Sequence, residues 1–449
     1  MTRTSVQSPD KALFIGLCLL LLWAPLPLGS NRPWAMQLLQ AWCALLAAGL
    51  CWHLARGTLA LSPLLRKSWP ILTAFAGILI WTGVQLVVTD NTTPIVFSLQ
   101  KTITFSLFFL ICLQLLSTPA RLEACANIVV LSGVFQAIYA VLVTMGGSDF
   151  DLLGLKLVSP FKDATTGTFV NRNHLAGYLE MSLATGIGLL MAGLEPSGAA
   201  VSWRERSRRL LRTLLGGKAR IRLFLVIMVI ALVMTGSRMG NAAFFASMGV
   251  CAVIGFVLYR KASRSLVVLF ASMIVIDLFI ISAWFGLDRL AQRLEQTHIS
   301  EEVRLDVNAN AWPWFTDHWL TGAGAGSFGS SFPAYRTADV GPFFDFAHND
   351  YLQILGEYGV VGGAFFALAV ISTLAIAIQA QRHRRNRTLR GIAFAAMMGI
   401  TSLMIHASVD FNHYIPANAL LFILLCAFAW TARHLDTQPS KVRESRKDR

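Results

Sequence analysis

Long apolar runs alternate with short polar loops along the whole chain, and this alternation constrains the fold more than any other feature. A run of about 20 apolar residues is long enough to cross a bilayer as a helix. Of the 449 residues, 55% are hydrophobic and 14% are charged, whereas a soluble domain has about 25% charged residues. Twelve runs fit a span: 12–30, 34–55, 70–88, 98–117, 123–145, 174–193, 223–236, 239–259, 265–286, 359–380, 391–409 and 416–432. We therefore expect an all-α polytopic membrane protein with about twelve transmembrane helices.

Lysine and arginine are concentrated in every second loop. If both chain ends lie on the same side of the membrane, 28 of the 38 basic residues fall on that side. Cytoplasmic loops are enriched in basic residues, so we place both termini in the cytoplasm. The net charge of +14 is then a topology signal that also favours contact with membrane lipids, and we expect no nucleic-acid partner.

The predicted spans divide the chain into four regions. These are helices one to nine with short loops (1–286), one large outward loop (287–358), helices ten to twelve (359–432) and a basic tail (433–449). The large loop has an apolar stripe that predicts a helix up to about Phe315, and Gly322–Gly326 should end regular structure. The first run is long and contains Pro25 and Pro27, so we expect a retained span and not a cleaved signal peptide. Seven cysteines without a Cys-x-x-Cys pair predict neither disulfides nor a metal site.

Three polar clusters occupy loops that are poor in basic residues. They are Asn171-Arg172-Asn173-His174, Ser237-Arg238 and His348-Asn349-Asp350-Tyr351, and each precedes a span that runs inward from the outer face. Each cluster therefore lies at a helix N-terminus, where free N–H groups and the helix dipole favour anions. Arg172 and Arg238 add the side chain best suited to bidentate phosphate contact, and Arg304 in the large loop could fold over the same place. The outer face is thus predicted to bind a phosphate or pyrophosphate.

Each of these residues also has a structural interpretation. Ser237 fits a helix N-cap, and Asn171 and Asn173 fit turns. An outward arginine fits an interfacial anchor, and Arg304 by itself fits a solvated loop charge.

His348 is the strongest candidate for acid–base chemistry, since histidine titrates near neutral pH and can accept a hydroxyl proton. Asp345 or Asp350 could orient its ring, although a purely structural histidine is the ordinary alternative. Glu180 and Asp277 lie inside predicted spans, which points to an ion or proton path. Glu180 is near the outer end of its span and could also line an outer cavity, whereas Asp277 is near mid-span and is the one feature that favours a transporter.

Taken in order along the chain, these motifs resemble the O-antigen ligase and polymerase superfamily. The resemblance covers about residues 160–365. It rests on Gly167–Gly177, Thr235-Gly-Ser-Arg238, Arg304, Gly322-x-Gly-x-Gly326-Ser-Phe328, His348-Asn-Asp-Tyr-Leu352 and Glu357-x-Gly359. Together the motifs are specific, whereas each one alone is weak.

The resemblance implies a glycosyltransferase that acts at the periplasmic face of a bacterial inner membrane. The donor would be a glycan on undecaprenyl pyrophosphate, and the acceptor a sugar hydroxyl of the lipid A core. His348 would be the general base, with Arg238 and Arg304 stabilising the leaving pyrophosphate in an inverting displacement that needs no metal or other cofactor. The residues expected to bind pyrophosphate or glycan are Arg172, Asn173, His174, Ser237, Asn349 and Tyr351.

Within the superfamily the sequence favours the ligase branch. Protein O-oligosaccharyltransferases resemble the chain in the same motifs but usually carry a larger C-terminal extension, whereas only residues 433–449 follow the last predicted span here. Polymerases, which join repeat units to one another, rank second after the ligases, and protein O-oligosaccharyltransferases rank third. A transporter of lipid-linked sugars is the alternative from another class.

Overall fold

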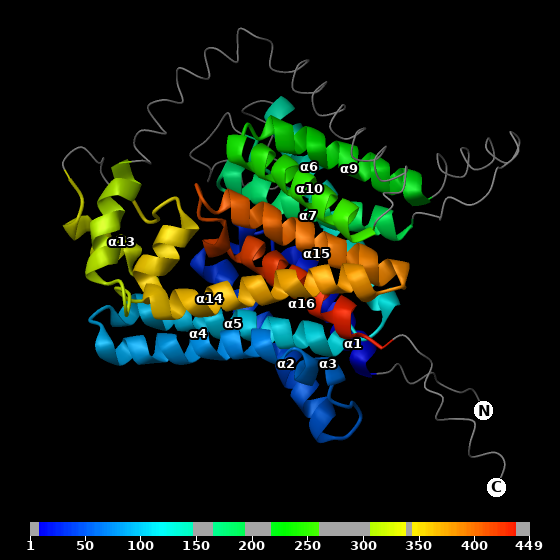
Figure 1. Ribbon diagram of the computed structural model, residues 1–449, viewed down its shortest axis with the longest axis horizontal. Helices are drawn as coiled ribbons and strands as arrows, with labels where there is room; N and C mark the ends of the chain where they lie inside the picture. Colours follow the sequence, from blue (N-terminus) through cyan, green and yellow to red (C-terminus); the bar gives the residue numbers. More distant parts are fainter. Residues whose placement is uncertain (1–8, 147–164, 194–216, 260–305, 338–343, 437–449) are drawn as a thin grey trace, which may run out of the picture.

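The computed structural model describes residues 9–146, 165–193, 217–259, 306–337 and 344–436, and these ranges contain helices but no β-strand (Figure 1). The helices are α1 (Pro9–Trp23), α2 (Pro33–Ala55), α3 (Pro63–Lys67), α4 (Trp69–Val88), α5 (Thr92–Leu115), α6 (Pro119–Met145), α7 (Arg172–Ala192), α9 (Gly217–Met234), α10 (Arg238–Tyr259), α13 (Phe328–Ser331), α14 (Asp350–His383), α15 (Arg387–His406) and α16 (Pro416–His434). Residues 306–317 form a further helix.

Nine of the described helices are long and apolar enough to cross a membrane: α2, α4, α5, α6, α7, α10, α14, α15 and α16. The prediction of a multi-pass helical membrane protein is therefore confirmed. The predicted run 265–286 lies outside the described residues. The predicted run 223–236 overlaps helix α9, which begins earlier, at Gly217, and ends at Met234.

The first predicted span, 12–30, is wrong at its end. Helix α1 stops at Trp23, and a turn and a short 3-10 helix, η1 (Leu28–Ser30), replace the last part of the run. The cause is local, because Pro25 and Pro27 lack the N–H groups that an α-helix needs in its interior.

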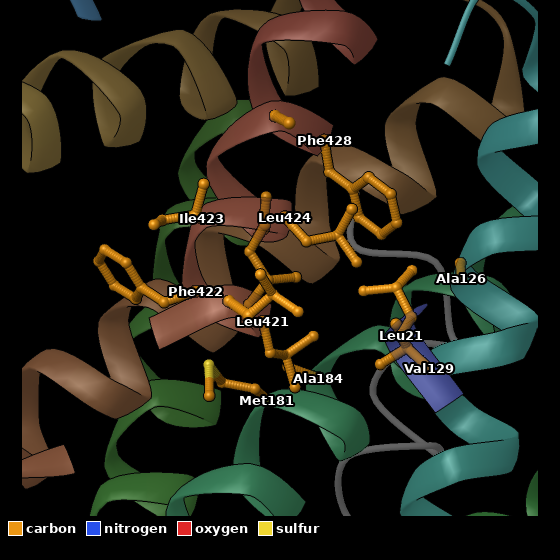
Figure 2. Close-up of a cluster of buried hydrophobic side chains, with 14 of the residues drawn as sticks. Leu21, Ala126, Val129, Met181, Ala184, Leu421, Phe422, Ile423, Leu424 and Phe428 are labelled. Carbon is orange, nitrogen blue, oxygen red and sulfur yellow. The ribbon is translucent and has the colours of Figure 1, made fainter. Parts of the chain in front are cut away.

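Three helices form the centre of the bundle. Side chains of α7 and α16 are almost all buried, and most of those of α15 are buried too. Figure 2 shows α16 side chains, including Leu421 and Leu424, packed beside Met181 and Ala184 of α7. Helices α7 and α15 approach closely where Gly188 faces Gly391, since a Cβ atom on either glycine would collide with the other's carbonyl oxygen. Small residues at helix crossings allow this close packing in membranes.

The predicted inside segments meet at one end of the bundle. Arg121 at the start of α6 pairs with Asp10 of α1 at 2.7 Å, and Lys67 at the end of α3 pairs with Asp436 at 3.2 Å. Arg384, directly after α14, donates to backbone carbonyl oxygens at the end of α16. The opposite end carries α13 and the starts of α7, α10 and α14 (Figure 1).

The described part of the large loop packs on the start of α14. Its helix 306–317 confirms the predicted helix within this range, and it buries Val307, Ala311 and Trp314 on one side. Trp314 contacts the edge of Phe328 in α13 with ring centroids 5.2 Å apart. The predicted break is also present, because the glycines of Gly322–Gly326 have φ angles of +76°, +111° and +74°.

Candidate functional site

The starts of α7, α10 and α14 lie close together at the end of the bundle that carries α13. The His174 and His348 rings both contact Phe411, at centroid distances of 4.6 and 4.8 Å. A Cβ atom on Gly240, in the first turn of α10, would lie 2.7 Å from Cβ of Ala176 in α7. The fold thus brings together the three polar clusters that the sequence separates.

Several residues of these clusters cap the helices. The side-chain oxygen of Asn171 accepts from the N–H of Asn173 at 2.9 Å, and Ser237 Oγ accepts from the N–H of Gly240 at 3.3 Å. Asn349 accepts from the N–H groups of Tyr351 and Leu352 at 3.1 and 3.2 Å. The structural interpretation therefore holds for Asn171 and Ser237, and it extends to Asn349.

Of the three candidate arginines, the structure describes two, and each of these is the first residue of a helix. Arg172 begins α7 and Arg238 begins α10, and both side chains are exposed. The positive end of a helix dipole does not stabilise a positive side chain. An anion at the same place is stabilised both by the dipole and by the arginine. This end of the bundle is therefore suited to a negatively charged group. Arg304 lies outside the described residues.

His348 has a left-handed backbone, with a φ of +52°. Such a φ is uncommon for a residue with a side chain and costs about 1–2 kcal/mol. Hydrogen bonds on both sides hold it, since the Ala347 N–H donates to Gln353 Oε1 at 2.9 Å and the Asp350 N–H donates to the Ala407 carbonyl at 2.9 Å. Backbone strain of this kind is found preferentially at functional sites.

Asp350, one of the two carboxylates expected to orient His348, is engaged elsewhere. It is buried, and its Oδ2 faces His413 Nδ1 at 2.7 Å and accepts from the His413 N–H at 3.1 Å. Asp345 is exposed. Tyr351 is also exposed in part, and its hydroxyl donates to the Met404 carbonyl at 2.8 Å.

Asp410, which the sequence analysis did not single out, lies at the centre of the site. It is fully buried, its Oδ1 accepts from the Phe411 N–H at 2.8 Å and lies 3.7 Å from His174 Nε2, and its Oδ2 lies 3.9 Å from His406 Nε2. Burial would raise the pKa of Asp410, but His174, His406 and His348 together lower it below its ordinary value. Asp410 is thus a charged carboxylate among three imidazoles.

His174 belongs to this buried group and not to the exposed surface of Arg172, because only 4% of the residue is exposed. The sequence held one hint of the arrangement. His406 and Asp410 are four residues apart at the end of the predicted span 391–409, a spacing that places two side chains on one side of a helix.

Glu180 lies deeper in the bundle and has two partners from α15. Ser402 Oγ donates to Glu180 Oε2, and His406 Nδ1 lies against Glu180 Oε1, both at 2.7 Å. The second intramembrane carboxylate of the sequence analysis, Asp277, lies outside the described residues. Within the described ranges, no group of three or more His, Cys, Asp or Glu side chains is arranged to hold a metal ion.

Glu357 connects the large loop to the bundle. Its buried carboxylate accepts from the N–H groups of Gly326 (2.9 Å) and Phe328 (3.4 Å), from Gln353 Nε2 (3.0 Å) and from the Tyr414 hydroxyl (2.8 Å). Gly359, with a φ of +66°, interrupts α14 just beyond it. The Gly-rich and Glu-x-Gly motifs therefore form one structural unit.

Residues 223–367 match the family model described as O-antigen ligase. The matched range begins in α9 and includes Arg238, Arg304, His348 and Glu357. No curated protein matches the chain. The family match confirms the resemblance inferred from the motifs.

Proposed function

We propose that this member of the O-antigen ligase family transfers a glycan from undecaprenyl pyrophosphate to a sugar hydroxyl of the lipid A core, at the periplasmic face of a bacterial inner membrane. What supports the proposal is that the helix starts that carry Arg172, Arg238 and His348 lie close together at one end of the bundle, and that residues 223–367 match the O-antigen ligase family model.

The donor contributes the anion that this end of the bundle suits. A pyrophosphate at the starts of α7 and α10 would be stabilised by Arg172 and Arg238 and by the positive ends of the two helix dipoles. Arg304, from the large loop, would add a third positive charge. Negative charge on the pyrophosphate grows as the sugar leaves, so these contacts strengthen in the transition state.

His348 would act as the general base. Its imidazole takes the proton of the acceptor hydroxyl, the hydroxyl oxygen bonds to the anomeric carbon, and the bond from that carbon to the pyrophosphate oxygen breaks. The electron pair of this bond leaves with undecaprenyl pyrophosphate, and a single displacement inverts the anomeric carbon. Asp410, whose charge is coupled to His348, would stabilise the imidazolium that forms.

The test is transfer by purified protein in detergent, with an undecaprenyl-pyrophosphate glycan, a lipid A–core acceptor and excess chelator. The decisive variant is His348→Asn, because asparagine tolerates a positive φ but cannot act as a base near neutral pH. His383→Asn is the matched control, since His383 is exposed at the other end of α14 and, among the described residues, bonds only the Gln379 carbonyl of its own helix.

We expect His348→Asn to keep the melting temperature of the wild type and to lower transfer by roughly 10²–10⁴-fold, the usual contribution of a general base. His383→Asn should transfer normally. Transfer that survives His348→Asn would refute the assigned base. Lengthening of the donor glycan without transfer to lipid A–core would instead assign polymerase activity.

A further inference from the structure

Glu180 and His406 form a carboxylate–imidazole pair deeper in the bundle than Asp410, and the mechanism proposed above does not use it. Glu180 of α7 and His406 of α15 are both buried, and Glu180 Oε1 lies 2.7 Å from His406 Nδ1. Burying two ionisable groups in the interior of a membrane bundle is energetically costly, so their presence there points to a function. Their position next to the site suggests what that function is.

His406 lies between two carboxylates. Its Nδ1 faces Glu180, and its Nε2 lies 3.9 Å from Asp410 Oδ2. Among the described residues neither His406 Nε2 nor Asp410 Oδ2 has a hydrogen-bond partner, although both atoms are buried. The distance is too long for a hydrogen bond but short enough for a strong charge interaction at low dielectric.

Within the described residues, the charged and titratable groups that interact with Asp410 come from α7, from α15 and from the start of α14. His174 belongs to α7, His406 to α15, and His348 precedes α14, whose first residue is Asp350. A carboxylate 2.7 Å from His406 Nδ1 favours positive charge on that ring, and such a charge, 3.9 Å from Asp410 Oδ2, would offset part of the negative charge of Asp410. Asp410 is then less able to hold a proton on His348.

We propose that Glu180 and His406 form a positioning pair that sets the basicity of His348 through Asp410. This inference rests on the proposed function, because it assumes that His348 is the base. Glu180 and His406 touch neither substrate nor reacting atoms in this mechanism, so their contribution appears in the pH dependence of transfer.

The test is the pH profile of kcat/KM for His406→Gln. A glutamine amide can still donate to Glu180 but carries no charge, so Asp410 loses its positive neighbour and retains the proton of His348 more strongly. The acid limb of the profile should move to higher pH by roughly half a unit or more. The matched control is Ser402→Ala, which removes a hydrogen bond to Glu180 without changing any charge and should leave the limb in place.

A uniform loss of rate at all pH values, with the limb unmoved, would show that the pair is only structural and would overturn the proposal. If His406→Gln does not fold, Glu180→Gln replaces it. Without its carboxylate partner the His406 ring favours its neutral form, so Asp410 again loses a positive neighbour. Because Glu180 is farther from Asp410 than His406 is, the acid limb of the profile should move in the same direction by a smaller amount.

A second readout does not depend on transfer. Diethyl pyrocarbonate modifies an imidazole only in its neutral form, so the modification of His348 against pH, measured by mass spectrometry at that residue, reports its titration directly. His406→Gln should shift this titration upward, and an unchanged titration would refute the positioning pair. If the wild type shows no transfer but His406→Gln still shifts the titration, the proposed function fails while the coupling between these residues stands.

Discussion

Replacing Glu357 tests whether the large loop is held by this one carboxylate. The side chain is 1% exposed, and it accepts hydrogen bonds from Gly326, Phe328, Gln353 and Tyr414. In Glu357→Ala all four donors lose their acceptor inside the protein. A buried donor without a partner costs about 1–3 kcal/mol, and relaxation of the exposed parts of the loop lowers the sum, so we expect a loss of about 4 kcal/mol in the free energy of unfolding.

Glu357→Gln separates the hydrogen bonds from the size of the side chain. The glutamine keeps one carbonyl oxygen, which can serve two donors, but its NH2 group faces the other two donors. The expected loss is therefore about half as large, ~2 kcal/mol.

The assay is unfolding in mixed detergent micelles, with Glu123→Ala as the control because Glu123 is exposed on α6. The control should change the free energy of unfolding by less than about 0.5 kcal/mol. If Glu357→Ala unfolds at the same denaturant concentration as the control, the loop is held by other contacts and the argument is wrong.

Three further predictions follow from single residues. Gly359→Ala should cost roughly 2 kcal/mol or more of unfolding free energy, because its φ is +66° and a Cβ atom would meet the backbone of Leu320, and a melting curve measures this. Arg238→Lys keeps the charge but loses the bidentate fork, so transfer should fall by ~10²-fold with an unchanged melting temperature, whereas normal transfer would exclude a direct pyrophosphate contact. The pKa of Asp410 is lower in the folded protein than its ordinary value of 3.8, so its stabilising effect is complete above that value and is lost as the pH falls through the folded pKa. Asp410→Asn should therefore lower the melting temperature strongly at pH 7 and somewhat less at pH 3, which lies below the ordinary value but above the folded one, and a larger drop at pH 3 than at pH 7 would contradict the assignment.

Hydropathy predicted most of the described helices because insertion of a segment into a membrane depends mainly on its own side chains. Its errors have local causes. At Pro25 and Pro27 the apolar run continues although the α-helix ends at Trp23, since hydropathy does not register the missing N–H groups. At α14 the helix begins at Asp350, nine residues before the predicted span, and Gly359 lies where the run was predicted to start.

The candidate site was predicted in part. The sequence identified the three clusters and their places at helix N-termini, and the structure brings those helix starts together. It did not identify Asp410, and it could not distinguish the capping roles of Ser237 and Asn349 from substrate contact, because the same side-chain oxygens serve both purposes.

The sequence by itself determined a multi-pass helical bundle, the residue types at each helix start and the family match. Only the tertiary structure decided which buried polar and charged groups face each other. Glu180 and His406 are 226 residues apart in sequence, and Gln85 binds the carbonyl of Glu357 across 272 residues. Apolar length and loop charge act within one segment and can be read along the chain. The pairing of ionisable side chains depends on how helices pack and rotate against one another, which no single segment specifies.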